Sequence, residues 1–90
     1  GISLSRKGVA LTAFGPNPDG EGTILRVWEQ GGTTGKLKVT LPSDSKFTSA
    51  IPVTLRGEKS GEAVQISDGK LSFFLHAYAP VSFILKEQGK

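Results

Sequence analysis

The chain has 90 residues, a formal net charge of +3 and no cysteine. This length supports one hydrophobic core, so we expect a single domain over residues 1–90 with neither disulfides nor thiolate metal sites. Its 11 basic and 8 acidic residues form no basic stripe, which argues against a nucleic-acid partner. No apolar stretch approaches the roughly 18 residues of a membrane span, which argues against a membrane partner.

Short runs of alternating apolar and polar residues, closed by glycine, proline, asparagine or aspartate, dominate the sequence. They predict strands at residues 2–5, 8–14, 22–30, 36–41, 51–56, 63–67, 70–77 and 81–86. Helical spacing extends over no useful length. We therefore expect an all-β fold, an antiparallel two-sheet β-sandwich of seven or eight strands, immunoglobulin-like or of a related type.

The connections carry recognisable turn chemistry. Asp68 and Gly69 lie between two alternating runs, and glycine accepts the positive φ of a type I′ turn, so we expect the flanking strands to pair as a hairpin. Residues 15–22, 31–35 and 57–61 read as longer loops rich in glycine. Strand-like sequence begins directly after Gly1, which indicates a domain excised from a longer chain.

Alternation assigns one face of each strand to the interior between the sheets. The expected interior residues are Val9, Leu11, Leu25, Val27, Leu37, Val39, Leu41, Val53, Leu55, Val64, Ile66, Leu71, Phe73, Leu75, Val81, Phe83 and Leu85. The outer face should be polar, but it also carries Ile24, Arg26 and Trp28 on one strand, Phe74, His76 and Tyr78 on another, and Ile84 on a third. A strand that is apolar on both sides is normally covered on both, so we expect something to lie against this sheet.

Candidates for chemistry are few. Glycosidic hydrolysis usually needs two carboxyl groups about 5–9.5 Å apart in a concave site, and every acid except Glu29 falls in a turn, loop or tail. His76 is the only histidine, so a transition-metal site would have to rest on carboxylates, and any Ser-His-Asp triad would have to use this residue. We expect no catalytic residue and no cofactor.

Calcium is the one metal to consider. Asn17, Asp19 and Glu21 supply oxygen ligands at alternate positions of a loop rich in glycine and proline. The spacing is not that of a full EF-hand, so an ordinary turn is the simpler interpretation.

Two aromatic residues could contact a partner. Sugar recognition by a small β domain generally needs exposed planar aromatics beside polar groups, and Trp28 and Tyr78 qualify chemically. Amphipathic aromatics are also favoured at protein interfaces, so contact with a neighbouring domain, or packing at the edge of the core, is the competing interpretation.

Three segments of the chain carry a family resemblance. Residues 23–32, Thr-Ile-Leu-Arg-Val-Trp-Glu-Gln-Gly-Gly, resemble a segment in the C-terminal β region of large bacterial glycoside hydrolases of the α-mannosidase type. In those enzymes a strand of the form apolar-Leu-Arg-apolar-aromatic-Glu precedes a glycine turn and a Val-x-Leu strand, which residues 38–42 match. Residues 77–85 resemble the terminal strand of such enzymes. Together with residues 55–58, the resemblance spans residues 8–86, and accessory domains of α-rhamnosidases share these patterns.

The resemblance implies a β-sandwich of the glycosidase C-terminal type in an extracytoplasmic bacterial enzyme, periplasmic or secreted. It implies as partner a catalytic domain upstream in the same parent chain. It carries over no catalytic or metal-binding residue, because none of the family's catalytic motifs occurs here.

Three functions remain open. We favour an accessory domain that packs against and stabilises the catalytic domain through a face bearing Ile24, Trp28, Phe74 and Tyr78. The alternatives are a carbohydrate-binding module that uses Trp28 or Tyr78, and an immunoglobulin-like interaction domain, for which the fold alone would suffice.

Overall fold

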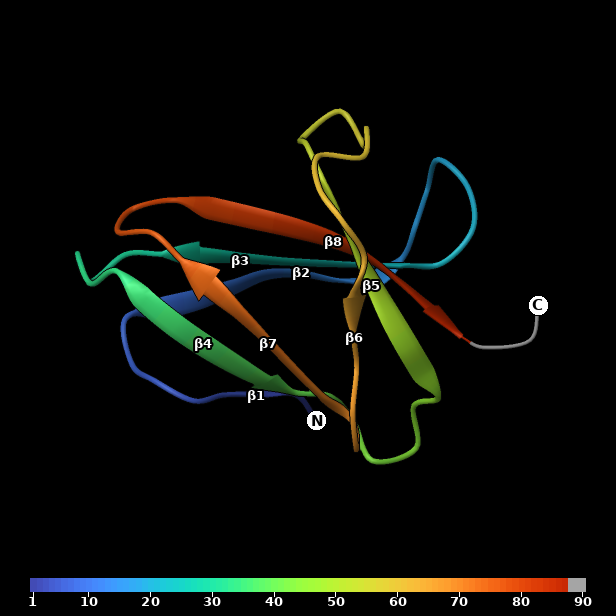
Figure 1. The fold of residues 1–90 in the computed structure, drawn as a ribbon, viewed down its shortest axis with the longest axis horizontal. Coiled ribbons are helices and arrows are strands. Elements are labelled where there is room, and N and C mark those ends of the chain that lie inside the picture. Colours follow the sequence, from blue (N-terminus) through green and yellow to red (C-terminus); the bar gives the residue numbers. More distant parts are fainter. Residues whose placement is uncertain (88–90) are drawn as a thin grey trace.

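Two antiparallel sheets pack face to face over residues 1–87, the part of the chain that the computed structural model describes (Figure 1). The smaller sheet has the order β1-β4-β7, formed by β1 (Ser3–Leu4), β4 (Gly35–Thr40) and β7 (Lys70–Leu75). The larger sheet has the order β2-β3-β8-β5-β6, formed by β2 (Val9–Pro16), β3 (Thr23–Glu29), β8 (Pro80–Glu87), β5 (Phe47–Val53) and β6 (Val64–Gln65). The expected all-β sandwich is confirmed. No helix occurs within residues 1–87, and hence none there that could cross a membrane.

The core lies between the inner faces of the two sheets, as the alternation predicts. Its buried members are Leu25, Val27, Leu37, Val39, Leu41, Ala50, Ile66, Leu71, Leu75, Phe83 and Leu85. The rings of Phe73 and Phe83 come from opposite sheets, and their centroids lie 4.7 Å apart, so aromatic packing joins the layers. Leu11, an expected core residue, is 38% exposed because it lies on the edge strand β2 beside a β-bulge.

The fifth strand is displaced from its expected position. β5 ends at Val53, and Thr54 begins a turn in which its Oγ1 accepts hydrogen bonds from the backbone N–H groups of Arg56 and Glu58. Gly57 completes the turn with a φ of +83°. The side-chain hydroxyl thus competes with strand pairing at Thr54. Leu55, which we expected in the core, is 73% exposed at this turn. Val53, also expected in the core, lies opposite Ser82 and lines a hollow on the outer face instead.

The turn at Asp68 and Gly69 is confirmed, but the expected pairing of the flanking strands as a hairpin is wrong. Both residues have positive φ, +54° and +72°, as a type I′ turn requires. Pairing across the turn is limited to Ser67 and Lys70, because β6 pairs with β5 in the larger sheet while β7 belongs to the smaller one. The turn therefore carries the chain from one sheet to the other.

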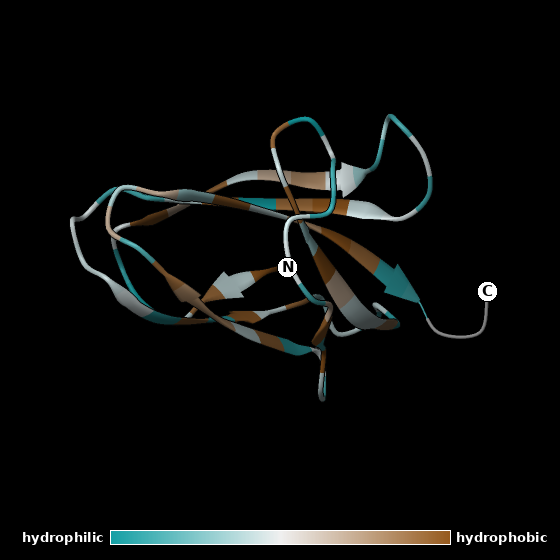
Figure 2. Cartoon of the chain, turned by 45° about the horizontal axis from the view of Figure 1, so that its top comes forward, coloured by the Kyte–Doolittle hydropathy of each residue, from teal (hydrophilic) through white to brown (hydrophobic). Residues whose placement is uncertain are grey.

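Two loops stand on the outer side of the five-stranded sheet, away from the three-stranded sheet (Figure 2). One joins β2 to β3, and the other follows β5 and carries Leu55. Gly22, at the end of the first loop, has a φ of +90°, and a Cβ there would lie 2.7 Å from Ile84 Cγ2 and 2.9 Å from the backbone oxygen of Leu85. The loop therefore packs directly against β8.

We expect Gly22→Ala to destabilise the domain more than Gly69→Ala. Both glycines have positive φ, which costs a residue with a Cβ about 1 kcal/mol. A Cβ at Gly69 meets no atom within 4 Å, whereas one at Gly22 meets backbone, which adds an overpacking cost of about 1–3 kcal/mol. Chemical denaturation of the two variants and the parent sequence measures the difference. Equal losses would contradict the close packing at Gly22.

Candidate functional site

A buried carboxylate joins two loops at one end of the sandwich. Glu29 is the last residue of β3, faces inward and is 1% exposed. Its Oε1 accepts hydrogen bonds from the backbone N–H groups of Gly32 at 2.8 Å and Tyr78 at 2.9 Å, and its Oε2 accepts from Gly31 and Thr33, each at 3.1 Å. The carboxylate therefore ties the loop after β3 to the turn before β8. We call this arrangement the Glu29 clamp.

The Glu29 clamp favours the ionised carboxylate. Donation from the Tyr78 N–H is the largest influence on the pKa of Glu29, and the N–H groups of Thr33, Gly32 and Gly31 act in the same direction. Burial opposes them, because it disfavours charge. Together they lower the pKa of Glu29 from 4.5 to about 2.

The clamp also fixes the positions of Trp28 and Tyr78. Tyr78 has a φ of +62° in a turn closed by the Ala79 N–H donating to the His76 carbonyl at 3.1 Å. The indole Nε1 of Trp28 donates to the Tyr78 carbonyl at 3.1 Å. The Tyr78 ring covers Gly32, where an added Cβ would lie 2.6 Å from the tyrosine hydroxyl. Trp28 and Tyr78 are thus brought together by a hydrogen bond from the indole side chain to the Tyr78 backbone carbonyl.

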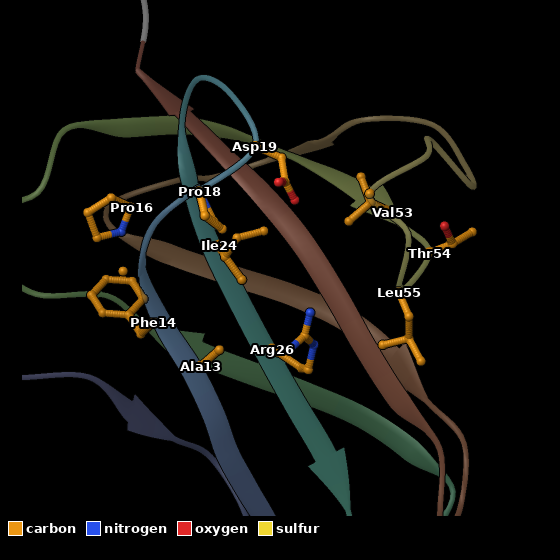
Figure 3. A pocket seen from close by; sticks show the side chains of 12 residues that line it. Ala13, Phe14, Pro16, Pro18, Asp19, Ile24, Arg26, Val53, Thr54 and Leu55 are labelled. Carbon is orange, nitrogen blue, oxygen red and sulfur yellow. The ribbon is translucent and has the colours of Figure 1, made fainter.

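The outer face of the five-stranded sheet is hollowed. On its floor, β3 and β8 place Ile24 opposite Ile84, Arg26 opposite Ser82 and Trp28 opposite Pro80. One hollow, of about 350 Å³, lies between the two outer loops (Figure 3) and is lined by Ala13, Phe14, Gly15, Pro16, Pro18, Asp19, Ile24, Arg26, Val53, Thr54, Leu55 and Gly57. A second, of about 330 Å³, is lined by Thr12, Arg26, Trp28, Leu55 and Pro80. Because Arg26 and Leu55 line both hollows, we treat them as one feature and call it the outer trough.

Arg26 lies on the floor of the outer trough. Its side chain is half-buried, and its Nε donates to Ser82 Oγ at 2.9 Å. Leu55, on the loop after β5, and Trp28, on β3, flank it with apolar surface. The trough therefore presents a guanidinium group within a largely apolar surround.

The structure separates the six residues that we expected to form a domain interface or a sugar platform, namely Ile24, Arg26, Trp28, Phe74, His76 and Tyr78. Ile24, Arg26 and Trp28 share the outer trough. Phe74 and His76 lie on or next to β7 of the three-stranded sheet, where their rings form an edge-to-face pair 5.0 Å apart. The expectation that these residues share one sheet is therefore wrong, because β3 and β7 belong to opposite layers. Tyr78 lies in the turn between the layers.

Ile84 is covered by the chain itself. It points outward from β8 between Ile24 of β3 and Ile51 of β5, yet it is only 8% exposed. The loop that ends at Gly22 packs over it. Part of the apolar outer surface thus needs no external partner.

The loop with the calcium candidates has the geometry of a turn. Asn17 Nδ2 donates to the Glu21 carbonyl at 3.0 Å, and Asn17 Oδ1 accepts from the Asp19 N–H at 3.1 Å. The Asn17 amide is therefore used to close the loop. Within residues 1–87, no group of three or more histidine, aspartate or glutamate side chains is placed to hold a metal ion.

Sequence reasoning missed Glu29 and Leu55. The signal for Glu29 was available, since it continues the inward alternation of Leu25 and Val27 and two glycines follow it closely. A carboxylate on an inward position needs several donors, and a glycine-rich loop can supply backbone N–H groups. The sequence gives no comparable signal that Leu55 is exposed. Its alternation with Val53 is the pattern expected if the strand continued through residue 55.

The fold defines the class of the protein as an antiparallel β-sandwich domain. Residues 8–83 match the family described as "Glycosyl hydrolases family 38 C-terminal beta sandwich domain". The chain belongs to this family, which confirms the resemblance to the C-terminal region of α-mannosidase-type enzymes. No curated protein and no solved structure matches the chain.

Glu29→Gln should destabilise the domain in a pH-dependent way. The amide retains one acceptor oxygen, so two of the four backbone N–H groups lose their partner. Because folding lowers the pKa of Glu29 from 4.5 to about 2, its stabilisation is complete above about pH 4.5 and is lost as the pH falls towards about 2. The difference in thermal midpoint between the two proteins should therefore shrink across this interval.

Thermal unfolding followed from neutral pH to about pH 2 measures this difference. Glu62→Gln, in an exposed loop, is the matched control for the loss of one carboxylate. A difference for Glu29→Gln that stays constant over the whole pH range would contradict the clamp.

Proposed function

We propose that this chain is a non-catalytic accessory domain of a glycoside hydrolase, which packs against the catalytic domain of its parent chain and stabilises it. The observation that carries the proposal is the family match over residues 8–83, because that family is defined as the C-terminal sandwich of glycosyl hydrolases. A domain of this kind is expected to support a catalytic domain elsewhere in the chain.

The exposed apolar side chains support a packing role. Leu55 is 73% exposed, Tyr78 68%, Phe74 59% and Trp28 46%. Single exposed apolar residues are ordinary, but Leu55 and Trp28 line one continuous trough. Exposed apolar side chains that lie together mark interaction sites more often than apolar side chains scattered singly over the surface.

The placement of the acids supports a non-catalytic role. Hydrolysis of a glycosidic bond usually needs a pair of carboxyl groups about 5–9.5 Å apart across a substrate cleft. Asp19 is the one acid among the residues that line the outer trough within the described chain. Glu29 is buried, and four backbone N–H groups occupy its two oxygens. The outer trough therefore lacks the pair of carboxyl groups that the reaction requires.

A carbohydrate-binding module is the second candidate. Trp28 is half-exposed and lines a hollow with Arg26 and Thr12, which places an aromatic face beside hydrogen-bonding groups. This is the arrangement that pyranose rings favour. Trp28 is the only tryptophan, so its fluorescence reports on this hollow alone.

The 90-residue chain should hydrolyse no aryl glycoside. The expected result is a rate equal to that of buffer with every aryl α- or β-glycoside, including aryl α-mannosides. Release of nitrophenol that survives repurification and disappears when Asp19 is changed to Asn would contradict the non-catalytic assignment.

Trp28→Ala should leave the isolated domain folded. The ring is half-exposed on the outer face, so its removal should cost less than the loss of a core side chain, about 2–5 kcal/mol for Leu25→Ala. Urea unfolding of the two variants gives the comparison. In the parent enzyme, Trp28→Ala should lower the thermal midpoint if the trough is covered by the catalytic domain.

Soluble mannan separates the two candidate functions. If the domain packs against a protein partner, mannan leaves the Trp28 emission spectrum of the 90-residue chain unchanged. A saturable shift in that emission would favour the carbohydrate-binding module instead.

A further inference from the structure

The outer trough contains a positive charge that the described chain does not balance. The guanidinium of Arg26 is half-buried, and the partner of its Nε is the neutral hydroxyl of Ser82. Within residues 1–87 it forms no salt bridge. A guanidinium has five N–H donors in a planar fork that matches a carboxylate, so most of its binding capacity remains available.

The acid of the trough does not fill this role. Asp19 lies on the loop after β2, at the wall of the hollow, whereas Arg26 lies on the floor (Figure 3). The loop is held by hydrogen bonds of Asn17 to the Asp19 N–H and the Glu21 carbonyl. Within residues 1–87, no hydrogen bond or salt bridge joins the Asp19 carboxylate to Arg26, whose Nε donates to Ser82.

The surround of Arg26 sets the chemistry of an occupant. Leu55 and Trp28 flank it on the side of the second hollow, and Ile24 and Val53 on the side of the first. Once an occupant covers this surface and excludes water, the attraction between a carboxylate and the guanidinium is screened less than in water. The two hollows, of about 350 and 330 Å³, are each large enough for a side chain from another polypeptide.

We propose that the outer trough is the docking surface for the catalytic domain, and that this domain contributes an aspartate or glutamate to the Arg26 guanidinium and an apolar side chain to the hollow beside Leu55 and Trp28. This inference rests on the proposed accessory role. It specifies which of the two outer faces docks and which charge the partner carries. The face of the three-stranded sheet, with Phe74, stays outside the contact.

The test is differential scanning calorimetry of the parent chain that contains this domain. The wild-type parent should unfold with this domain and the catalytic domain coupled in one transition. Arg26→Met keeps most of the apolar stem but removes the charge. We expect this variant to make the domain unfold separately from the catalytic domain. We also expect it to lower the midpoint of the domain by about 4–8 °C, the shift that follows the loss of a single interaction in a domain of about 60–100 residues. Arg26→Lys should retain part of the coupling, because it keeps the charge but not the fork.

Three variants serve as controls. Ser82→Ala removes the hydrogen bond to Arg26 but keeps the charge, so it separates local support of the side chain from pairing with the partner. Asp19→Asn removes the trough's own acid and should leave the coupling intact. Phe74→Ala removes a large exposed side chain from the opposite face and should also leave it intact.

The outcomes distinguish the inference from the function on which it rests. If Phe74→Ala uncouples the domains and Arg26→Met does not, the inference is overturned while the accessory role stands. If Ser82→Ala uncouples the domains as much as Arg26→Met, the proposal that the partner contributes a carboxylate to Arg26 is overturned. If the wild-type domains melt independently, or if the parent chain has no catalytic domain, both the inference and the accessory role fail.

Discussion

The hydrogen bonds from four backbone N–H groups to the Glu29 carboxylate hold together one end of the sandwich, where the chain crosses between the two sheets. Three of the donors belong to the loop between β3 and β4, and the fourth is Tyr78, in the turn between β7 and β8. Each of these connections leads from one sheet to the other. A single buried charge thus links these two of the connections between the sheets. The same turn gives Trp28 its hydrogen-bond acceptor, so the position of the indole at the rim of the outer trough depends on the clamp.

The two outer faces of the sandwich differ for a structural reason. The five-stranded sheet carries two loops on its outer side, and the hollow between them brings Ile24 and Leu55 to the same surface as the Arg26 guanidinium (Figure 3). The three-stranded sheet has lysines beside Phe74 on its outer side, with Lys36 directly opposite it in the register. A concave, largely apolar surface with one unbalanced charge suits a specific protein contact better than a face of mixed polarity.

The sequence predicted the parts of this structure that depend on the two-residue alternation of apolar and polar side chains and on the chemistry of the turn residues. The alternation of Leu25, Val27 and their counterparts located the core, and the Asp68-Gly69 pair located a turn with positive φ. It could not predict which strands share a sheet. Trp28 and Phe74 both point outward by alternation, but assignment to a layer depends on long-range pairing, which a single sequence does not reveal. The exposure of Leu55 depends on the Thr54 hydroxyl, which helps to end β5 at Val53 and not at the expected residue 56, and the trough depends on loops that pack above the sheet.

The proposed docking surface is tested most directly by an experimental structure of the longer chain that we propose contains this domain. If the proposal holds, a catalytic domain should cover the outer trough, with an aspartate or glutamate oxygen within about 4 Å of the Arg26 guanidinium and an apolar side chain against Leu55. The outer face of the three-stranded sheet should remain open to solvent. A structure in which the catalytic domain packs on Phe74 and leaves Arg26 facing water would contradict the account.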